Sequence, residues 1–115
     1  MLGPDAQILL LDLREAADYA RAHIKESLNF PAPGITQDAQ IAKLLRVKVD
    51  REKKVVVYHW DERKGAFYAK LLFEKGFDNV FLLTGGFAEF IQKHTQEVDG
   101  RDVETVRIES RLIEA

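Results

Sequence analysis

The chain has 115 residues, of which 46% are hydrophobic and 31% are charged, and it contains no cysteine. A chain of this length suits one small domain with a single core. The formal net charge of −2 gives no field that would favour nucleic acid or an anionic membrane as a partner, and the lack of cysteine excludes disulfides, thiolate metal sites and thiol nucleophiles. No apolar run reaches the ~18 residues of a membrane-spanning helix. The lack of cysteine fits an intracellular protein, so we expect a cytoplasmic location.

The first half of the chain begins with a strand. Residues 7–13 contain a continuous apolar run, Ile8 to Leu11, which Asp12 closes, and this pattern is typical of a strand buried on both faces. The elements predicted after it are a short alanine-rich helix, a brief strand, a loop with two prolines, and a helix with Asp38 as its N-cap: residues 15–22, 27–30, 31–36 and 39–47.

The middle of the chain predicts a strand, a polar loop and a helix. Val55 to Tyr58 is β-branched and aromatic and apolar on both faces, as an interior parallel strand requires. The following helix is predicted from Ala66 to Lys75, and its expected inward residues are Ala66, Ala69, Leu72 and Phe73. Between strand and helix, His59 to Lys64 form a six-residue loop at the carboxyl end of a strand, where open α/β sheets hold their ligands.

The last elements are a buried strand, a tight glycine turn and a helix: residues 80–83, 84–86 and 87–94. The alternation of strands and helices predicts an α/β fold with a mainly parallel central sheet and helices on both faces. We place one domain at residues 1–94 and a C-terminal tail at 95–115. In the tail we expect a linker over 96–102, and we consider that a strand at 105–108 and a helix at 109–114 complete the fold.

Several spaced motifs are similar to those of rhodanese domains. They are Leu10-Leu11-Asp12-Leu13-Arg14-Glu15, Tyr19, His23-Ile24, Asn29 and Pro31, followed by Gly76-Phe77, Asn79-Val80 and Thr84-Gly85-Gly86-Phe87. The set covers most of residues 7–94 in the order that the family has. The resemblance implies a rhodanese-like three-layer fold, in agreement with the pattern of elements.

The resemblance also implies that the catalytic position is lost. Active rhodaneses carry a cysteine just after the central strand, which accepts sulfane sulfur as a persulfide, and an ungapped match places His59 there. Persulfide transfer needs a soft nucleophile that is partly thiolate, so we expect no sulfurtransferase activity, and we expect no cofactor. Asp61 and Glu62 offset Arg63 and Lys64, so this former active-site loop is not expected to bind anions tightly.

The other motif residues are interpreted as structural. Asp12 and Arg14 suit an ion pair that holds the turn after the first strand, and His23 suits a packed, hydrogen-bonded histidine. Gly85 and Gly86 suit the tight turn. Nothing in the spacing brings the histidines and carboxylates together as zinc ligands, so no metal is predicted.

The candidate partner-binding residues are Trp60, Arg63, Phe67 and Tyr68. For Trp60 two alternatives stay open: it is an exposed interaction anchor, or it folds back to cap the core. The leading hypothesis is a catalytically inactive domain that acts as a protein-interaction or regulatory module. The alternatives are an enzyme that uses His59 for acid–base or phosphoryl chemistry, and a regulatory domain similar to the cysteine-less rhodanese domains of some phosphatases.

A narrower resemblance concerns the loop and the segments after it. Tyr58, Asp61-Glu62-Arg63, the run from Gly76 to Phe81 and Gly85-Gly86 look like the cysteine-less rhodanese domain of a centrosomal and ciliary family associated with tubulin glutamylation. This resemblance implies a location at the cytoskeleton, centrosome or cilium, and partners among tubulin-modifying or ciliary proteins. The sequence leaves the oligomeric state open.

Overall fold

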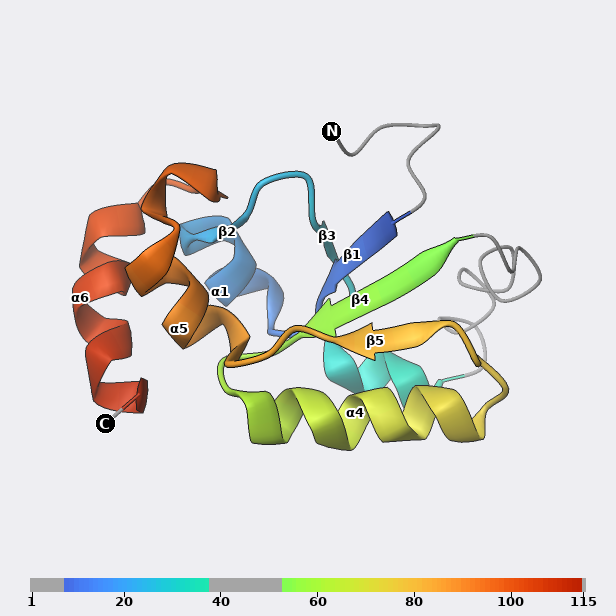
Figure 1. Cartoon of the computed structure of the whole chain (residues 1–115). Coiled ribbons are helices and arrows are strands. Elements are labelled where there is room, and N and C mark those ends of the chain that lie inside the picture. The colour runs from blue at the N-terminus through green and yellow to red at the C-terminus, as the bar shows by residue number, and fades with distance from the viewer. Residues whose placement is uncertain (1–7, 38–52, 115) are drawn as a thin grey trace.

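The computed structural model describes residues 8–37 and 53–114, and a four-stranded sheet is the centre of this part of the chain (Figure 1). The elements in chain order are β1 (Ile8–Asp12), α1 (Ala16–Arg21), β2 (His23–Ile24), β3 (Leu28–Asn29), the 3-10 helix η1 (Ala32–Thr36), β4 (Lys54–Tyr58), α4 (Glu62–Glu74), β5 (Val80–Leu82), α5 (Gly86–Lys93), the 3-10 helix η3 (Thr95–Glu97), β6 (Val98–Asp99) and α6 (Val103–Glu114). The sheet order is β3-β1-β4-β5, with every neighbouring pair parallel, while β2 and β6 form a separate antiparallel pair. This arrangement confirms the predicted α/β fold class.

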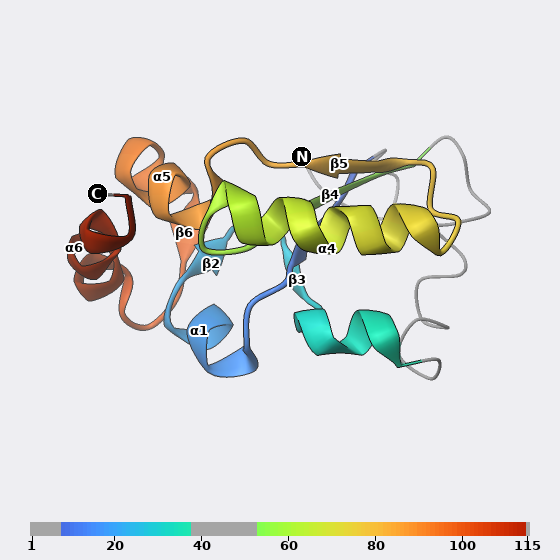
Figure 2. The same ribbon diagram turned by 90° about the horizontal axis from the view of Figure 1, so that it is seen from below.

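One face of the sheet is covered by α4 and η1, which lie together against the strands in Figure 2. The register of β1 and β4 pairs Leu11 with Val57, and both side chains are buried in the core cluster on this face. Leu72 of α4 and Ile35 of η1 complete the same cluster. Because both central strands are apolar on both faces, they form an interior layer, as predicted.

The opposite face is covered by helices near the carboxyl ends of the strands. Tyr58 of β4 packs there in a second core cluster with Phe87 of α5 and Val106 of α6, and α6 lies along α5. Farther from the carboxyl ends, Leu10 and Val56 line an apolar groove of about 350 Å³. The described core therefore consists of two clusters separated by the sheet.

The segment after β3 is a 3-10 helix, so the predicted loop over residues 31–36 is wrong. Pro31 is the N-cap of η1, and Pro33 lies in its first turn, where a residue without an N–H costs little. Ile35 is fully buried and anchors η1 to the sheet. The predicted N-cap Asp38 and the predicted helix over 39–47 lie outside the described residues.

Helix α4 begins at Glu62, four residues earlier than the predicted Ala66. Asp61 is its N-cap, and the side chain of Asp61 accepts a hydrogen bond from the backbone N–H of Lys64 at 2.8 Å. This cap stabilises the extra first turn. The loop predicted over residues 59–64 is therefore shorter in the structure and consists of His59–Asp61. Residues 62–64, which were predicted to belong to the loop, form the first turn of α4.

The inward face of α4 also differs from the prediction. Gly65 and Leu72 are buried against the sheet, whereas Ala66 and Phe73 are exposed. Gly65 allows a close approach, because a Cβ atom there would lie 2.7 Å from the Leu82 Cδ1 atom of β5. The hydrophobic stripe at Gly65, Tyr68, Ala69 and Leu72, rather than the one at Ala66, Ala69, Leu72 and Phe73, faces the core.

Strand β5 is an edge strand in the described sheet, and the prediction that it is buried is wrong. Phe81 at its centre is 49% exposed, since the sheet face to which it belongs is open at this point. The side chain of Lys54 lies over its ring, 5.8 Å from the centroid. The Lys54 side chain thus partly covers Phe81, an apolar residue that the sequence pattern predicted to be buried.

The segment after α5 packs against the rest of the chain. Val98 of β6 is buried and pairs with Ile24 of β2, so the predicted linker over residues 96–102 is wrong. The predicted strand at 105–108 is also wrong, because α6 is one continuous helix. Arg21 of α1 pairs with Asp102 at 2.9 Å, immediately before α6 begins.

Candidate functional site

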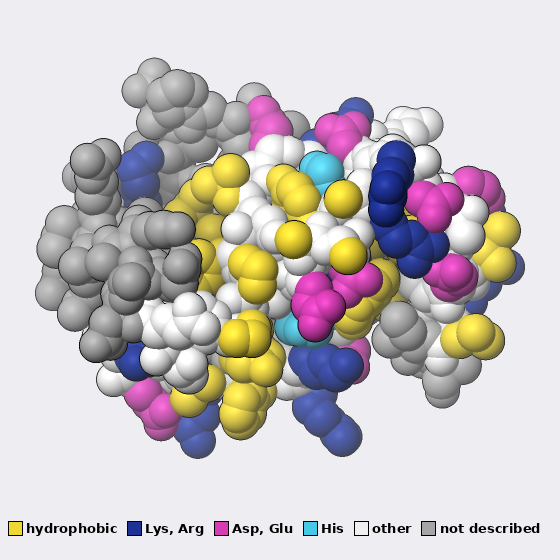
Figure 3. Space-filling view, turned by 180° about the vertical axis from the view of Figure 1, so that it is seen from behind, with side chains coloured by type: hydrophobic (Ala, Val, Ile, Leu, Met, Phe, Trp, Pro, Cys, Tyr) yellow, Lys and Arg dark blue, Asp and Glu magenta, His cyan; other side chains and the backbone are white. Residues whose placement is uncertain are grey.

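The loop His59–Asp61 lies at the carboxyl end of β4, beside the turn that follows β1. The chain pairs β3 on one side of β1 and β4 on the other, so the order of the strands reverses here, which is where open α/β sheets bind ligands. A cleft of about 370 Å³ opens at this point. Glu15 and Asp18 lie on one wall, and His59, Lys64 and Tyr68 lie on the other. Figure 3 shows this face, where acidic, basic and histidine side chains lie beside hydrophobic ones.

His59 occupies the cleft as a neutral imidazole. Its Nδ1 atom accepts a hydrogen bond from the backbone N–H of Trp60 at 2.8 Å, which places the ring hydrogen on Nε2. Its ring stacks on Tyr68 with the centroids 5.9 Å apart. Burial, and then the positive charge of Lys64, lower the pKa of His59 below its ordinary value.

The backbone of the loop is held by the first turn of α5. The N–H of Phe87 donates to the carbonyl oxygen of His59 at 2.9 Å, and the N–H of Ala88 donates to that of Trp60 at 3.0 Å. These donors would otherwise be unpaired at a helix N-terminus. The loop therefore has a defined position relative to α5.

The two glycines predicted as a turn have a direct role in holding the loop. Gly85 and Gly86 both have positive φ, 84° and 71°. A Cβ atom on Gly86 would lie 2.7 Å from the Cα atom of Asp61, so no other residue fits there without a shift. The N–H of Gly85 donates to Oε1 of Glu62 at 2.8 Å, which ties the turn to the start of α4.

Asp12 and Arg14 form a fully buried ion pair below the loop. The Arg14 Nη2 atom lies 2.7 Å from Oδ2 of Asp12 and also donates to the carbonyl oxygen of Ala22. Its Nη1 atom is buried without a hydrogen-bond partner among the described residues. The rings of Trp60 and Phe87 lie against the guanidinium, with centroids 4.4 Å and 4.1 Å from its carbon.

Trp60 is therefore folded back onto the buried Arg14 and is only half-buried itself. Of the two alternatives for this residue, the geometry favours the one in which it caps the core. Arg63 and Phe67 have a different environment: both are exposed on α4, and Phe67 is 60% exposed. Trp60 and Tyr68 line the cleft, and the Phe67 ring meets the Tyr68 ring edge-on with the centroids 5.1 Å apart, whereas Arg63 does not line the cleft.

His23 lies in β2, outside the cleft. Its Nδ1 atom is 2.7 Å from the carbonyl oxygen of Tyr19, and its ring stacks on the Tyr19 ring with the centroids 3.8 Å apart. Within residues 8–37 and 53–114, no group of three or more histidine and carboxylate side chains is placed to hold a metal ion. In the same ranges, no helix combines the length and apolarity needed to cross a bilayer.

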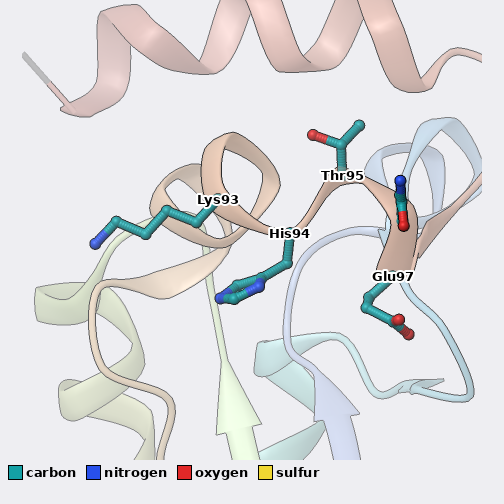
Figure 4. A pocket seen from close by; sticks show the side chains of 5 residues that line it. Lys93, His94, Thr95 and Glu97 are labelled. Atoms are coloured by element: carbon teal, nitrogen blue, oxygen red, sulfur yellow. The ribbon is translucent and has the colours of Figure 1, made fainter.

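A second hollow, of about 360 Å³, lies at the carboxyl end of α5. Its lining residues include Lys93, His94, Thr95 and Glu97, and Figure 4 shows their side chains pointing in different directions. His94 packs against the Phe90 ring, 5.0 Å away between centroids. These side chains do not converge on one point, so we assign no site here.

The parallel sheet order β3-β1-β4-β5, with helices packed on it, is that of a rhodanese-like α/β fold. The chain matches the Rhodanese-like domain family over residues 1–93 and belongs to that family. The BH2092 protein of Bacillus halodurans has a similar structure, with 26% identity and a TM-score of 0.67 over 85% of this chain and 67% of that one. A rhodanese-related protein of Thermoplasma volcanium shares the fold at 23% identity and a TM-score of 0.61, over 76% of this chain and 80% of that one.

The chain is also similar to a particular protein, Centrosomal protein of 41 kDa. It is 33% identical to the mouse protein and 34% identical to the zebrafish protein, in each case over 92 residues. The match covers 78% of this chain but only 25% of each relative, so the chain spans about a quarter of their length. This similarity confirms the resemblance to a centrosomal family that the loop motifs suggested.

Proposed function

We propose that this chain is a catalytically inactive rhodanese-like domain that binds a protein partner at the centrosome or cilium. The binding surface consists of the loop and the first turns of α4, residues 59–68, which we call the loop–helix surface. The observation that carries the proposal is the combination at this surface of a histidine in the position of the family's nucleophile with an exposed aromatic residue, Phe67, beside the cleft.

The chemistry of the former active site supports the absence of sulfur transfer. An imidazole nitrogen is not a soft nucleophile and does not form a persulfide, and the whole sequence holds no cysteine that could replace it. Asp61 and Glu62 place two carboxylates at the mouth of the loop, which disfavours an anionic sulfur donor.

The geometry of His59 argues against the alternative in which it is the catalyst. A general base or a phosphate acceptor needs a free nitrogen lone pair in the cleft and a partner that orients the ring. The Nδ1 lone pair of His59 is taken by the N–H of Trp60, and the Nε2 atom carries the hydrogen. The residue is thus a structural acceptor for the loop backbone.

The similarity to centrosomal proteins supports the proposed location, since the matching relatives carry that name. A small domain that spans a quarter of such a protein fits a module within a larger assembly. Partners among tubulin-modifying or ciliary proteins remain part of this proposal.

Site-specific photo-crosslinking tests the proposal. A photoreactive amino acid replaces Phe67 in one variant and the 82% exposed Leu112 of α6 in a matched control, and both are used in extracts of ciliated cells. We expect one discrete adduct from position 67 that unlabelled wild-type protein competes away, and none from position 112. Equal adducts at both positions, or none at either, would remove the loop–helix surface as the interface.

A further inference from the structure

The cleft beside the loop combines carboxylates with aromatic rings. Glu15 and Asp18 come from the start of α1, and the lining also includes the rings of Trp60 and Tyr68. The volume of about 370 Å³ lies in the range of about 300–1,000 Å³ that is usual for pockets that take a small ligand. The cleft can therefore accept a single side chain of a partner that is bound at the loop–helix surface.

The two carboxylates on the α1 side of the cleft are unpaired in the part of the chain that the structure describes. Neither Glu15 nor Asp18 takes part in an ion pair or a side-chain hydrogen bond within residues 8–37 and 53–114. Asp18 is also partly buried, so water solvates its charge only in part. A cation supplied by a ligand would pair with these charges and offset the cost of removing them from water.

The charges around the cleft are negative in sum. Among the described lining residues, Lys64 is the one cation, against the two carboxylates of α1. In the adjoining residues 61–63, the carboxylates of Asp61 and Glu62 outnumber the single cation of Arg63. His59 adds no charge at neutral pH, because burial and then the charge of Lys64 lower its pKa. The cleft therefore disfavours an anionic group and favours a cationic one.

The aromatic lining supplies a second attraction for a cation. An aromatic face attracts positive charge, and the planar guanidinium of arginine stacks on such rings and is more weakly hydrated than an ammonium. Trp60 already makes this contact within the chain, since the guanidinium carbon of Arg14 lies 4.4 Å from its ring centroid. Asp12 pairs with Arg14 at 2.7 Å, so the charge of that arginine is neutralised and does not repel a second cation strongly.

We infer that the cleft receives an arginine side chain of the protein partner. The guanidinium pairs with Glu15 and Asp18 and stacks on the aromatic lining, while the partner residues next to the arginine lie on the exposed Phe67. This inference rests on the proposed function, since it names the chemistry that the partner presents at the same surface.

The test is a titration of the ¹⁵N-labelled chain, followed by NMR. The sequence has one tryptophan, so the indole N–H signal of Trp60 reports directly from the lining of the cleft. The probe is an acetylated and amidated Gly-Ser-Arg-Leu-Ser-Gly peptide, and in three control peptides lysine, the uncharged isostere citrulline or glutamate replaces the arginine. We expect a saturable shift with the arginine peptide, about threefold weaker binding of the lysine peptide, and at least about tenfold weaker binding of the other two.

Two variants with the same net charge locate the binding in the cleft. Glu15→Gln combined with Asp18→Asn should weaken the arginine peptide about fivefold or more, because both carboxylates are lost. The matched control combines Glu74→Gln with Glu97→Gln, which removes two exposed carboxylates that do not line the cleft, and it should bind as the wild type does. The amide spectra, with unchanged signals away from the substitutions, confirm that both variants are folded.

The outcomes separate this inference from the proposed function. Equal binding of the citrulline or glutamate peptide, or full binding by the variant at Glu15 and Asp18, would overturn the cation site, and equal binding of the lysine peptide would overturn the assignment to arginine. If the arginine peptide leaves the Trp60 signal unshifted while photo-crosslinking at position 67 still captures a partner, the inference is wrong and the proposed function stands. If neither peptide binding nor crosslinking occurs, both are wrong.

Discussion

At the scale of single residues, the buried pair of Asp12 and Arg14 is the most consequential interaction near the loop. Both side chains are fully buried, and they share hydrogen bonds from Nε and Nη2 of Arg14. A buried ion pair adds little net stability compared with an apolar pair, but loss of one partner leaves the other charge unpaired. Removal of Arg14 would also take away the cation that the rings of Trp60 and Phe87 cover.

Replacement of Arg14 by glutamine should therefore lower the free energy of unfolding by about 3–5 kcal/mol, because Asp12 remains buried without its partner. Urea denaturation of the two proteins measures this difference. Arg63→Gln on the exposed face of α4 is the control, and it should change stability by less than about 0.5 kcal/mol. A loss below about 1 kcal/mol for Arg14→Gln would contradict the assignment of a buried pair.

His59 should make the stability of the domain depend on pH. Burial and the charge of Lys64 lower its pKa in the folded chain, so the unfolded chain binds the proton more readily. The contribution of His59 is then fully present above the unfolded pKa of about 6.5, and it is lost as pH falls from there through the folded pKa.

We expect the wild type to lose more stability between about pH 7.5 and pH 5 than His59→Asn does, since asparagine keeps an acceptor for the Trp60 N–H and does not titrate. Denaturation curves at both pH values give the comparison, and the carboxylates common to both proteins cancel in it. An equal loss in the two proteins would show that the histidine is not responsible.

At the scale of elements, the contact between the glycine turn and the loop after β4 decides where the candidate site lies. Gly86 has a φ of 71° and lies against the backbone of Asp61.

Gly86→Ala should destabilise the domain by about 2 kcal/mol or more, because the new Cβ meets backbone atoms that no side-chain rotation can move. Thermal unfolding measures the change, with the exposed neighbour Thr84→Ala as control; similar melting temperatures for both variants would refute this account.

The division of the chain at residue 94 was a prediction from sequence, and we propose instead that residues 95–114 belong to the same folded unit. The support is that Val106 of α6 is buried with Phe87 of α5, and that Arg21 of α1 pairs with Asp102. One buried contact and one partly exposed ion pair therefore join the segment after residue 94 to α5 and to α1.

Val106→Ala should consequently cost about 2 kcal/mol, whereas Leu112→Ala on the outer face of the same helix should cost less than about 0.5 kcal/mol. Chemical denaturation followed by tryptophan fluorescence is a suitable measurement, because Trp60 is close to Phe87. Two equally small effects would indicate that the tail is separable from the domain.

At the scale of the whole molecule, the proposed loss of sulfur chemistry has more than one cause. The nucleophile is absent from the sequence. In addition, the side chain of Asp61 in the three-residue loop accepts a hydrogen bond from the backbone N–H of Lys64, so this donor at the start of α4 already has a partner within the chain. Wild-type protein should show no transfer of sulfur from thiosulfate to cyanide, and His59→Cys should remain inactive although its thiol reacts with iodoacetamide. Turnover by His59→Cys above the buffer rate would show that the missing cysteine is the sole defect.

The accuracy of the sequence-based predictions differs from one element to another. The central strand at Val55–Tyr58 and the strand ending at Asp12 were correct, since a short apolar run bounded by polar residues has few other solutions. The early start of α4 was missed because its cap at Asp61 stands among polar residues that also suit a loop. The inward face of α4 was predicted only in part: Ala69 and Leu72 face the core as expected, but Gly65, which has no side chain, was not recognised as the site of a close contact.

The sequence by itself determined the α/β fold class, the membership of the rhodanese-like family and the absence of a thiol nucleophile, because these depend on local patterns, spaced motifs and composition. Only the tertiary structure decided that Trp60 folds onto Arg14, that Arg63 and Lys70 share one exposed stripe with Phe67, and that α6 packs on α5. Each of those outcomes depends on which side of a helix or loop meets the sheet. Residues far apart in the chain settle that choice, and no local pattern encodes it.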